Sequence, residues 1–166
     1  MADNPFCYAH IIPSMATPKL FLDSIGSWAG KSELHLSWLP EDERIVKSST
    51  TLKVESDAHN TFATLRYTWT HDGEDQQGLF VIAADESAIA TAGWSDSWHQ
   101  SGSVMSLKGE AKAIVNLKGS YSVEGYPDWG WRVQFSMEGA SLVMEMFNIS
   151  PEGEEEWAVR STYHRA

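Results

Sequence analysis

The sequence predicts an all-β protein: an antiparallel, up-and-down β-barrel of about 8–10 strands with one short helix before the first strand. Three observations support this prediction. From residue 26 onward, apolar and polar side chains alternate with a period of two, not 3.6. The links between the alternating segments have hairpin length, which is typical of antiparallel meanders. Each segment has one face to bury, and closing the sheet into a barrel removes its exposed edges.

The short helix is expected just after residue 17. Thr17 is a good N-cap residue, and Pro18 suits the first helical position. Leu20 and Phe21 fall on one side of the helix, and Gly26 ends the segment. The chain therefore enters the first strand directly from a single helical turn or two.

The strands follow from the alternation. In the first segment, even positions such as Trp28 and Leu34 are apolar or small, and the intervening Lys31 is polar. His71-Asp72-Gly73 is a turn signal between two such segments. Nine or ten short strands are predicted in this way, within residues 26–38, 45–55, 63–70, 78–83, 88–94, 104–110, 113–121, 129–137, 142–149 and 157–164.

The domain organisation is simple. Residues 1–16 are expected to form a flexible arm and residues 17–166 a single barrel domain, because no linker or fixed-period repeat divides them. The start of the chain lacks a basic segment, and His10 and Pro13 interrupt its apolar residues, so we expect no secretory signal and a cytoplasmic location. Cys7 is the single cysteine, which excludes an internal disulfide framework and a cysteine-rich zinc site.

Charge and hydropathy argue against three further classes. The formal net charge is −11, whereas a non-specific nucleic-acid binder needs a cationic surface, and so does a protein that docks on anionic membranes. No apolar run approaches the roughly 20 residues of a membrane span. The six histidines are scattered without a metal-ligand spacing, so we expect no metal site.

Several motifs, in order along the chain, carry a family resemblance: Gly26-Ser27-Trp28-Ala29-Gly30, Tyr67-Thr68-Trp69, Asp72-Gly73, Gly78, Trp94-Ser95-Asp96-Ser97-Trp98-His99 and Thr162-Tyr163-His164-Arg165. Together they resemble an uncharacterised bacterial family of lipocalin-like domains in the calycin superfamily, over about residues 20–166. The resemblance implies a lipocalin-like barrel and no agreed activity. It also implies that Trp28 plugs the closed end of the barrel, under the side chain of Arg160 or Arg165.

The last strand departs from the cytosolic fatty-acid carriers in the same superfamily. Those proteins hold the ligand carboxylate with an Arg-x-Tyr pair. Here Arg160 and Tyr163 are one residue further apart, which places them on opposite faces of a strand. The sequence therefore does not predict fatty-acid binding by that route.

The hexapeptide at residues 94–99 combines two Trp with a carboxylate and an imidazole. In an extended chain Trp94, Asp96 and Trp98 share one face and His99 lies on the other, so a turn or bulge would be needed to pair Asp96 with His99. Such a pair would be an oriented base. The segment follows the fifth strand, which runs parallel to the first, so we expect it at the open rim, far from Trp28. It can equally be a strand end with a capping Asp and a surface His.

The inward faces are predicted to carry aromatic rings and flexible methionine side chains. Tyr67, Trp69 and Phe135 are expected to point inward, with Met137 and one set from the following strand, either Met144 and Met146 or Val143 and Phe147. Such walls suit a flat or apolar ligand, and they suit a packed core equally well. Arg66, Arg132 and His35 are assigned to wet faces.

These observations favour a binding barrel for a small apolar or aromatic molecule, acting as a monomer or homodimer; they identify no cofactor. The candidate ligand-binding residues are Tyr67, Trp69, Trp94, Asp96, Trp98, His99 and Phe135, and no residue is assigned as catalytic. Two alternatives stay open. One is an enzyme acting on a hydrophobic substrate with Asp96 and His99 at the barrel mouth. The other is a filled barrel that works through surface contacts.

Overall fold

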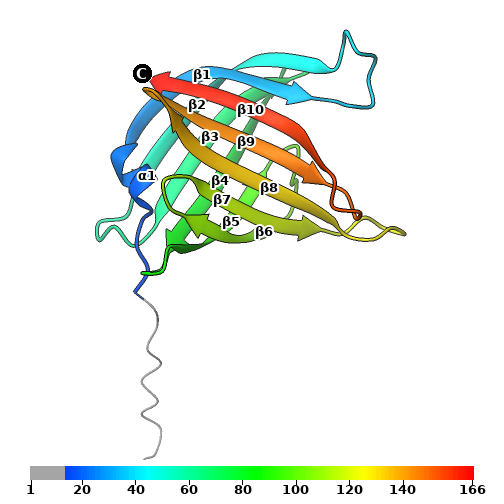
Figure 1. Ribbon diagram of the computed structural model, residues 1–166. Helices are drawn as coiled ribbons and strands as arrows, with labels where there is room; N and C mark the ends of the chain where they lie inside the picture. The colour runs from blue at the N-terminus through cyan, green and yellow to red at the C-terminus, as the bar shows by residue number, and fades with distance from the viewer. Residues whose placement is uncertain (1–13) are drawn as a thin grey trace, which may run out of the picture.

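The computed structural model describes residues 14–166 of the chain. They form a closed antiparallel barrel in which each strand pairs with its neighbours along the chain and the first strand pairs with the last. Figure 1 shows the barrel with α1 at one end and the long connection after β1 at the other. The elements are α1 (Lys19–Asp23), β1 (Gly26–His35), β2 (Ile45–Ser56), β3 (Ala63–His71), β4 (Glu74–Ala84), β5 (Ile89–Asp96), β6 (Met105–Ala111), β7 (Val115–Tyr121), β8 (Trp129–Glu138), β9 (Ser141–Ile149) and β10 (Glu155–Arg165).

The predicted fold class is confirmed, and the strand bounds differ only where turns decide them. Asp72 and Gly73 both have positive φ, at 50° and 78°, as the two central residues of a tight hairpin require. Because the turn is this short, β4 begins at Glu74, four residues before the predicted start. The connection after β1 is longer. The strand ends at His35, and Leu36 donates its N–H to the carbonyl of Arg44 across the loop.

The helix is present, but its predicted cap is wrong. The hydroxyl group of Thr17 lies 2.7 Å from Ser56 Oγ on β2, and Pro18 occupies the cap position without a side-chain hydrogen bond. The helix is held by packing, since Phe21 is fully buried edge-on against Phe135, with ring centroids 5.3 Å apart. Ala16, the last residue of the expected arm, already bonds to the barrel at Ala84, and most of that arm, including Cys7, lies outside the described residues.

Trp28 fills the end of the barrel next to α1. Its side chain is buried, and its indole N–H donates to the carbonyl of Ser24 at 2.8 Å. The guanidinium carbon of Arg165 lies 4.6 Å from the centre of the indole ring, a cation–π contact. Arg165 rather than Arg160 is therefore the covering arginine. Arg160 lies on the outside, where it bonds to Glu138 at 2.8 Å.

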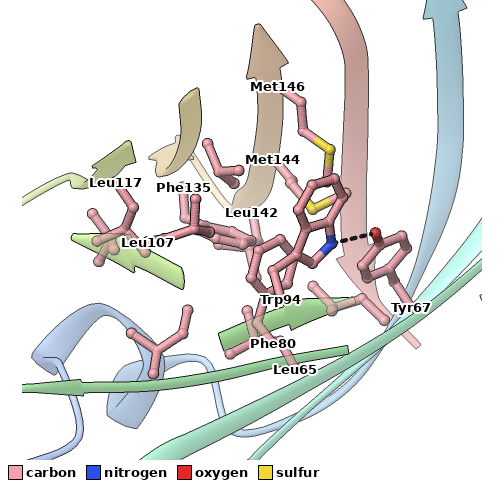
Figure 2. Packing of buried hydrophobic residues seen from close by; sticks show 14 of the residues in the cluster. Leu65, Tyr67, Phe80, Trp94, Leu107, Leu117, Phe135, Leu142, Met144 and Met146 are labelled. Atoms are coloured by element: carbon pink, nitrogen blue, oxygen red, sulfur yellow. Dashed lines mark hydrogen bonds between the residues drawn. The ribbon is translucent and has the colours of Figure 1, made fainter. Parts of the chain in front are cut away.

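The barrel interior above Trp28 is packed. Figure 2 shows aromatic, leucine and methionine side chains meeting in the middle of the barrel. Phe80 stacks on Trp94 with centroids 5.7 Å apart, and Met144 and Met146 are fully buried beside them. Met137, predicted to point inward, is 42% exposed, because it sits where β8 ends beside α1. Most of the interior is therefore core rather than cavity.

Within the described residues, no helix is long and apolar enough to cross a membrane.

Candidate functional site

A pocket lies at the end of the barrel opposite Trp28. Antiparallel pairing brings the ends of the odd strands and the starts of the even strands to this one rim. The pocket there has a volume of about 270 Å³. Its lining comes from these strand ends and the adjoining loops: Leu34, His35, Leu36, Ser37, Trp38, Trp94, Trp98, His99, Gln100, Met105, Tyr121, Trp131, Asn148, Glu156, Trp157 and Ala158. The segment at residues 94–99 thus lies at the rim predicted from strand direction.

The floor of the pocket is a stack of aromatic rings. Trp94 and Trp131 stack with centroids 5.5 Å apart and planes 9° from parallel, and Phe80 also stacks on Trp94. The indole N–H of Trp94 donates to the hydroxyl oxygen of Tyr67 at 3.0 Å, the bond drawn in Figure 2. Each ring of the floor is held by its neighbours, so its position is fixed before any ligand enters.

Asp96, the last residue of β5, organises the rim. Its side chain is buried, and one carboxylate oxygen accepts the backbone N–H groups of Trp98 and His99, both at 2.9 Å. The chain turns here, so Nδ1 of His99 comes to 3.3 Å from the same oxygen. The other oxygen accepts from the hydroxyl group of Tyr67 at 2.6 Å and from the indole N–H of Trp69 at 3.3 Å. The turn supplies the pairing that an extended strand forbids.

These contacts fix the protonation of Asp96. Burial alone would raise the pKa of this carboxyl group, but hydrogen bonds and charge from His99, with the hydrogen bond from Tyr67, lower it to about 2. The pKa of Tyr67 is raised well above its ordinary value, first by burial and then by the charge of Asp96. Asp96 is therefore an ionised acceptor, and Nδ1 of His99 must be the donor in their hydrogen bond.

His35 does not lie on a wet face, and that prediction is wrong. Its side chain is only 15% exposed, stacks on Trp157 with centroids 4.6 Å apart, and lines the pocket. Nδ1 of His35 lies 3.0 Å from the carbonyl oxygen of Trp157. The cause is local, because a bulge in β10 between Trp157 and Val159 breaks the register next to the end of β1. A bulge redirects side chains of its own strand, here next to Trp157, whose ring covers His35.

The predicted site residues divide by depth. Trp94, Trp98 and His99 line the pocket, and Asp96 lies behind His99. Tyr67 and Trp69 line, with His99 and Asp96, a smaller void of about 10 Å³ beneath it. Phe135 is deep in the core, in edge contact with Phe21 and Phe80, and takes no part in the pocket.

Sequence reasoning missed a group of rim residues. Trp131, Tyr121, Asn148 and Trp157 all line the pocket, and the hydroxyl group of Tyr121 lies 2.7 Å from the side-chain oxygen of Asn148. The signal that finds them is strand direction, which holds for every strand and not for the fifth alone. It places the ends of β7 and β9 and the starts of β8 and β10 at the same rim.

The fold and the site together define a closed antiparallel β-barrel with an aromatic pocket in its open end. Residues 17–165 match the model of the family described as "Protein of unknown function (DUF1579)", and the chain belongs to this family. A search of the curated proteins found no match.

Proposed function

We propose that this protein binds one small, planar, largely apolar molecule in the pocket at the barrel mouth. The pocket of about 270 Å³ above the Trp94 and Trp131 stack is the observation that supports this. A cavity of roughly 150 Å³ holds benzene, and drug-sized ligands occupy roughly 300 Å³ or more. The pocket therefore suits a molecule of one or two fused rings.

The aromatic walls favour a flat occupant. Trp98 and Trp157 flank the floor, and indole rings offer a large apolar face together with a polar edge. A planar molecule gains offset stacking with such rings beyond the burial of its area, whereas a flexible chain loses conformational freedom on entering. The lipocalin-like resemblance agrees with a binding role.

Quinoline is a suitable first probe, because it is flat and has two fused rings. We expect quinoline to bind to the purified protein in calorimetry and to quench tryptophan fluorescence. Trp98→Phe should remove part of the quench, and His99→Ala should weaken binding. His164→Ala is the matched control, since His164 is exposed on the last strand near the opposite end.

Native mass spectrometry gives a second, independent readout, because a ligand retained from the cell adds its own mass. Absence of quinoline binding together with absence of any retained small molecule would contradict the proposed function. That result would favour the alternative of a filled barrel that acts through surface contacts, because the interior is otherwise packed.

A second candidate function is catalysis at the same mouth, and the contact between Asp96 and His99 favours it. A carboxylate on Nδ1 orients the imidazole and leaves Nε2 as a base. If the site hydrolyses hydrophobic esters, the wild-type protein should cleave 1-naphthyl acetate faster than buffer does, and His99→Ala should return the rate to background. Equal rates for the two proteins would exclude His99 as a base in this reaction.

A further inference from the structure

Two nitrogen atoms of pocket-lining side chains have no hydrogen-bond partner among the described residues. They are Nε2 of His99 and Nε1 of Trp131, both buried. The two rings are neighbours, with centroids 5.6 Å apart. The side chain of His99 is 10% exposed and that of Trp131 is 6% exposed. A buried polar atom without a hydrogen-bond partner destabilises a protein, so two in one pocket call for an explanation.

The hydrogen-bonding role of each nitrogen is fixed by chemistry. Nδ1–H of His99 donates to the ionised Asp96, and in the neutral form of an imidazole held in this way Nε2 has a free lone pair and acts as an acceptor. The indole nitrogen of Trp131 is a donor only. The pocket thus offers one acceptor and one donor on adjacent rings.

We infer that the ligand carries a hydrogen-bond donor and an acceptor side by side on one edge, as a ring lactam does. This inference rests on the proposed function. The lactam N–H would donate to Nε2 of His99, and its carbonyl oxygen would accept from the N–H of Trp131. A hydrocarbon of the same shape leaves both nitrogens without a partner. A carboxylate has only acceptor oxygens, so it cannot donate to the lone pair on Nε2 of His99.

Four flat bicyclic probes of similar size separate the possibilities. 2-Quinolinone has a donor beside an acceptor, indole has a donor only, quinoline has an acceptor only, and naphthalene has neither. We expect 2-quinolinone to bind about tenfold or more tightly than naphthalene, with indole and quinoline between them. In a heteronuclear NMR spectrum, the Trp131 indole N–H signal, assigned by its loss in Trp131→Phe, should shift with 2-quinolinone and quinoline more than with naphthalene.

Trp131→Phe removes a nitrogen that has no partner, so it breaks no hydrogen bond of the folded protein. This variant should lose the advantage of 2-quinolinone over indole, whatever its affinity for naphthalene, which uses neither nitrogen. Trp157→Phe is the matched comparison, because it removes another indole from the pocket. It should change the four affinities together and keep their order.

Three outcomes are distinguishable. Equal affinities for all four probes, or an unchanged order in Trp131→Phe, would overturn the inference and leave the pocket as a simple apolar site. Failure of all four probes to bind would contradict the proposed function itself. An unmoved Trp131 signal in the presence of bound 2-quinolinone would also overturn the inference.

Discussion

Asp96 is the residue that couples the core of the barrel to its mouth. Asp96 is 2% exposed, and both of its carboxylate oxygens accept hydrogen bonds, from donors on β3 and in the turn after β5. A buried charge is tolerated when it is paired and its remaining lone pairs are satisfied, and removing a partner leaves it uncompensated. The position of His99 therefore depends on a residue that does not itself line the pocket.

Stability should depend on pH through Asp96. The pKa of this group is about 2 in the folded protein and near 3.8 ordinarily, so the unfolded chain binds a proton first as the pH falls. The resulting stabilisation, roughly 2 kcal/mol, is fully present above about pH 4 and is lost as the pH falls through about 2.

Urea denaturation of the wild-type protein and Asp96→Asn across this pH range tests the prediction. The difference in unfolding free energy should shrink as the pH falls from 4 to 2, and taking the difference cancels the other carboxyl groups. A difference that stays constant over this range would show that Asp96 has an ordinary pKa.

Gly78 is the second residue whose substitution has a clear expected effect on stability. A Cβ atom there would lie 2.0 Å from Cζ of Tyr67, the side chain that donates to Asp96. Gly78→Ala should therefore displace the Tyr67 ring and destabilise the protein by about 1–3 kcal/mol.

Gly93→Ala is the control on the neighbouring strand β5, since its Cβ would only touch a side-chain methyl group of Val104 at 3.4 Å. Its denaturation midpoint should be unchanged or slightly raised, because alanine restricts the unfolded chain. Similar midpoints for the two variants would contradict the close packing of Tyr67 against Gly78.

At the scale of elements, α1, β1 and β10 meet at Trp28. The carbonyl groups of Asp23 and Ile25 accept hydrogen bonds from Arg165, whose guanidinium covers the indole ring of Trp28. One buried side chain thus joins the helix to the strand pair that closes the barrel. The helix has five residues and no side-chain cap, so this packing rather than intrinsic propensity holds it.

Trp28→Ala should destabilise the protein by about 3–5 kcal/mol, the range for deleting a large buried aromatic side chain. Trp38→Ala is the comparison, because Trp38 is 70% exposed and its loss should change stability by less than about 0.5 kcal/mol. Chemical denaturation measures both. A midpoint of Trp28→Ala within error of wild type would show that the ring is not part of the core.

At the scale of the whole molecule, the barrel is closed by one long-range strand pair. All other pairs join strands that follow each other in the chain, and only β1 and β10 come from opposite ends of the described residues. Closure pairs every strand of the described residues on both sides. No exposed edge strand is left there to pair with another chain and cause aggregation. The turns at one end carry the pocket, and the other end is filled by Trp28.

Far-UV circular dichroism should show a spectrum dominated by β-structure, because the described residues contain ten strands and one five-residue helix. Saturation with quinoline should raise the thermal midpoint without changing this spectrum, since the pocket is formed before binding. A mainly helical spectrum would contradict the fold.

The sequence by itself determined the features that depend on local rules. Alternation identified the strands because a pleated strand turns successive side chains to opposite faces, and the Asp72-Gly73 pair marked its hairpin because both residues adopt positive φ. Strand direction placed residues 94–99 at the rim opposite Trp28, since antiparallel neighbours reverse at each turn.

Only the tertiary structure decided how the interior is shared between core and pocket. Alternation reports which face a side chain takes but not its depth along the barrel, so Phe135 and Trp94 read alike in the sequence although one is deep core and the other lines the pocket. Stacking on Trp157 of β10 covered His35, and the turn after β5 joined His99 to Asp96. The first depends on how strands from opposite ends of the chain pack when the barrel closes, and the second on a short turn that the alternation of apolar and polar residues does not record.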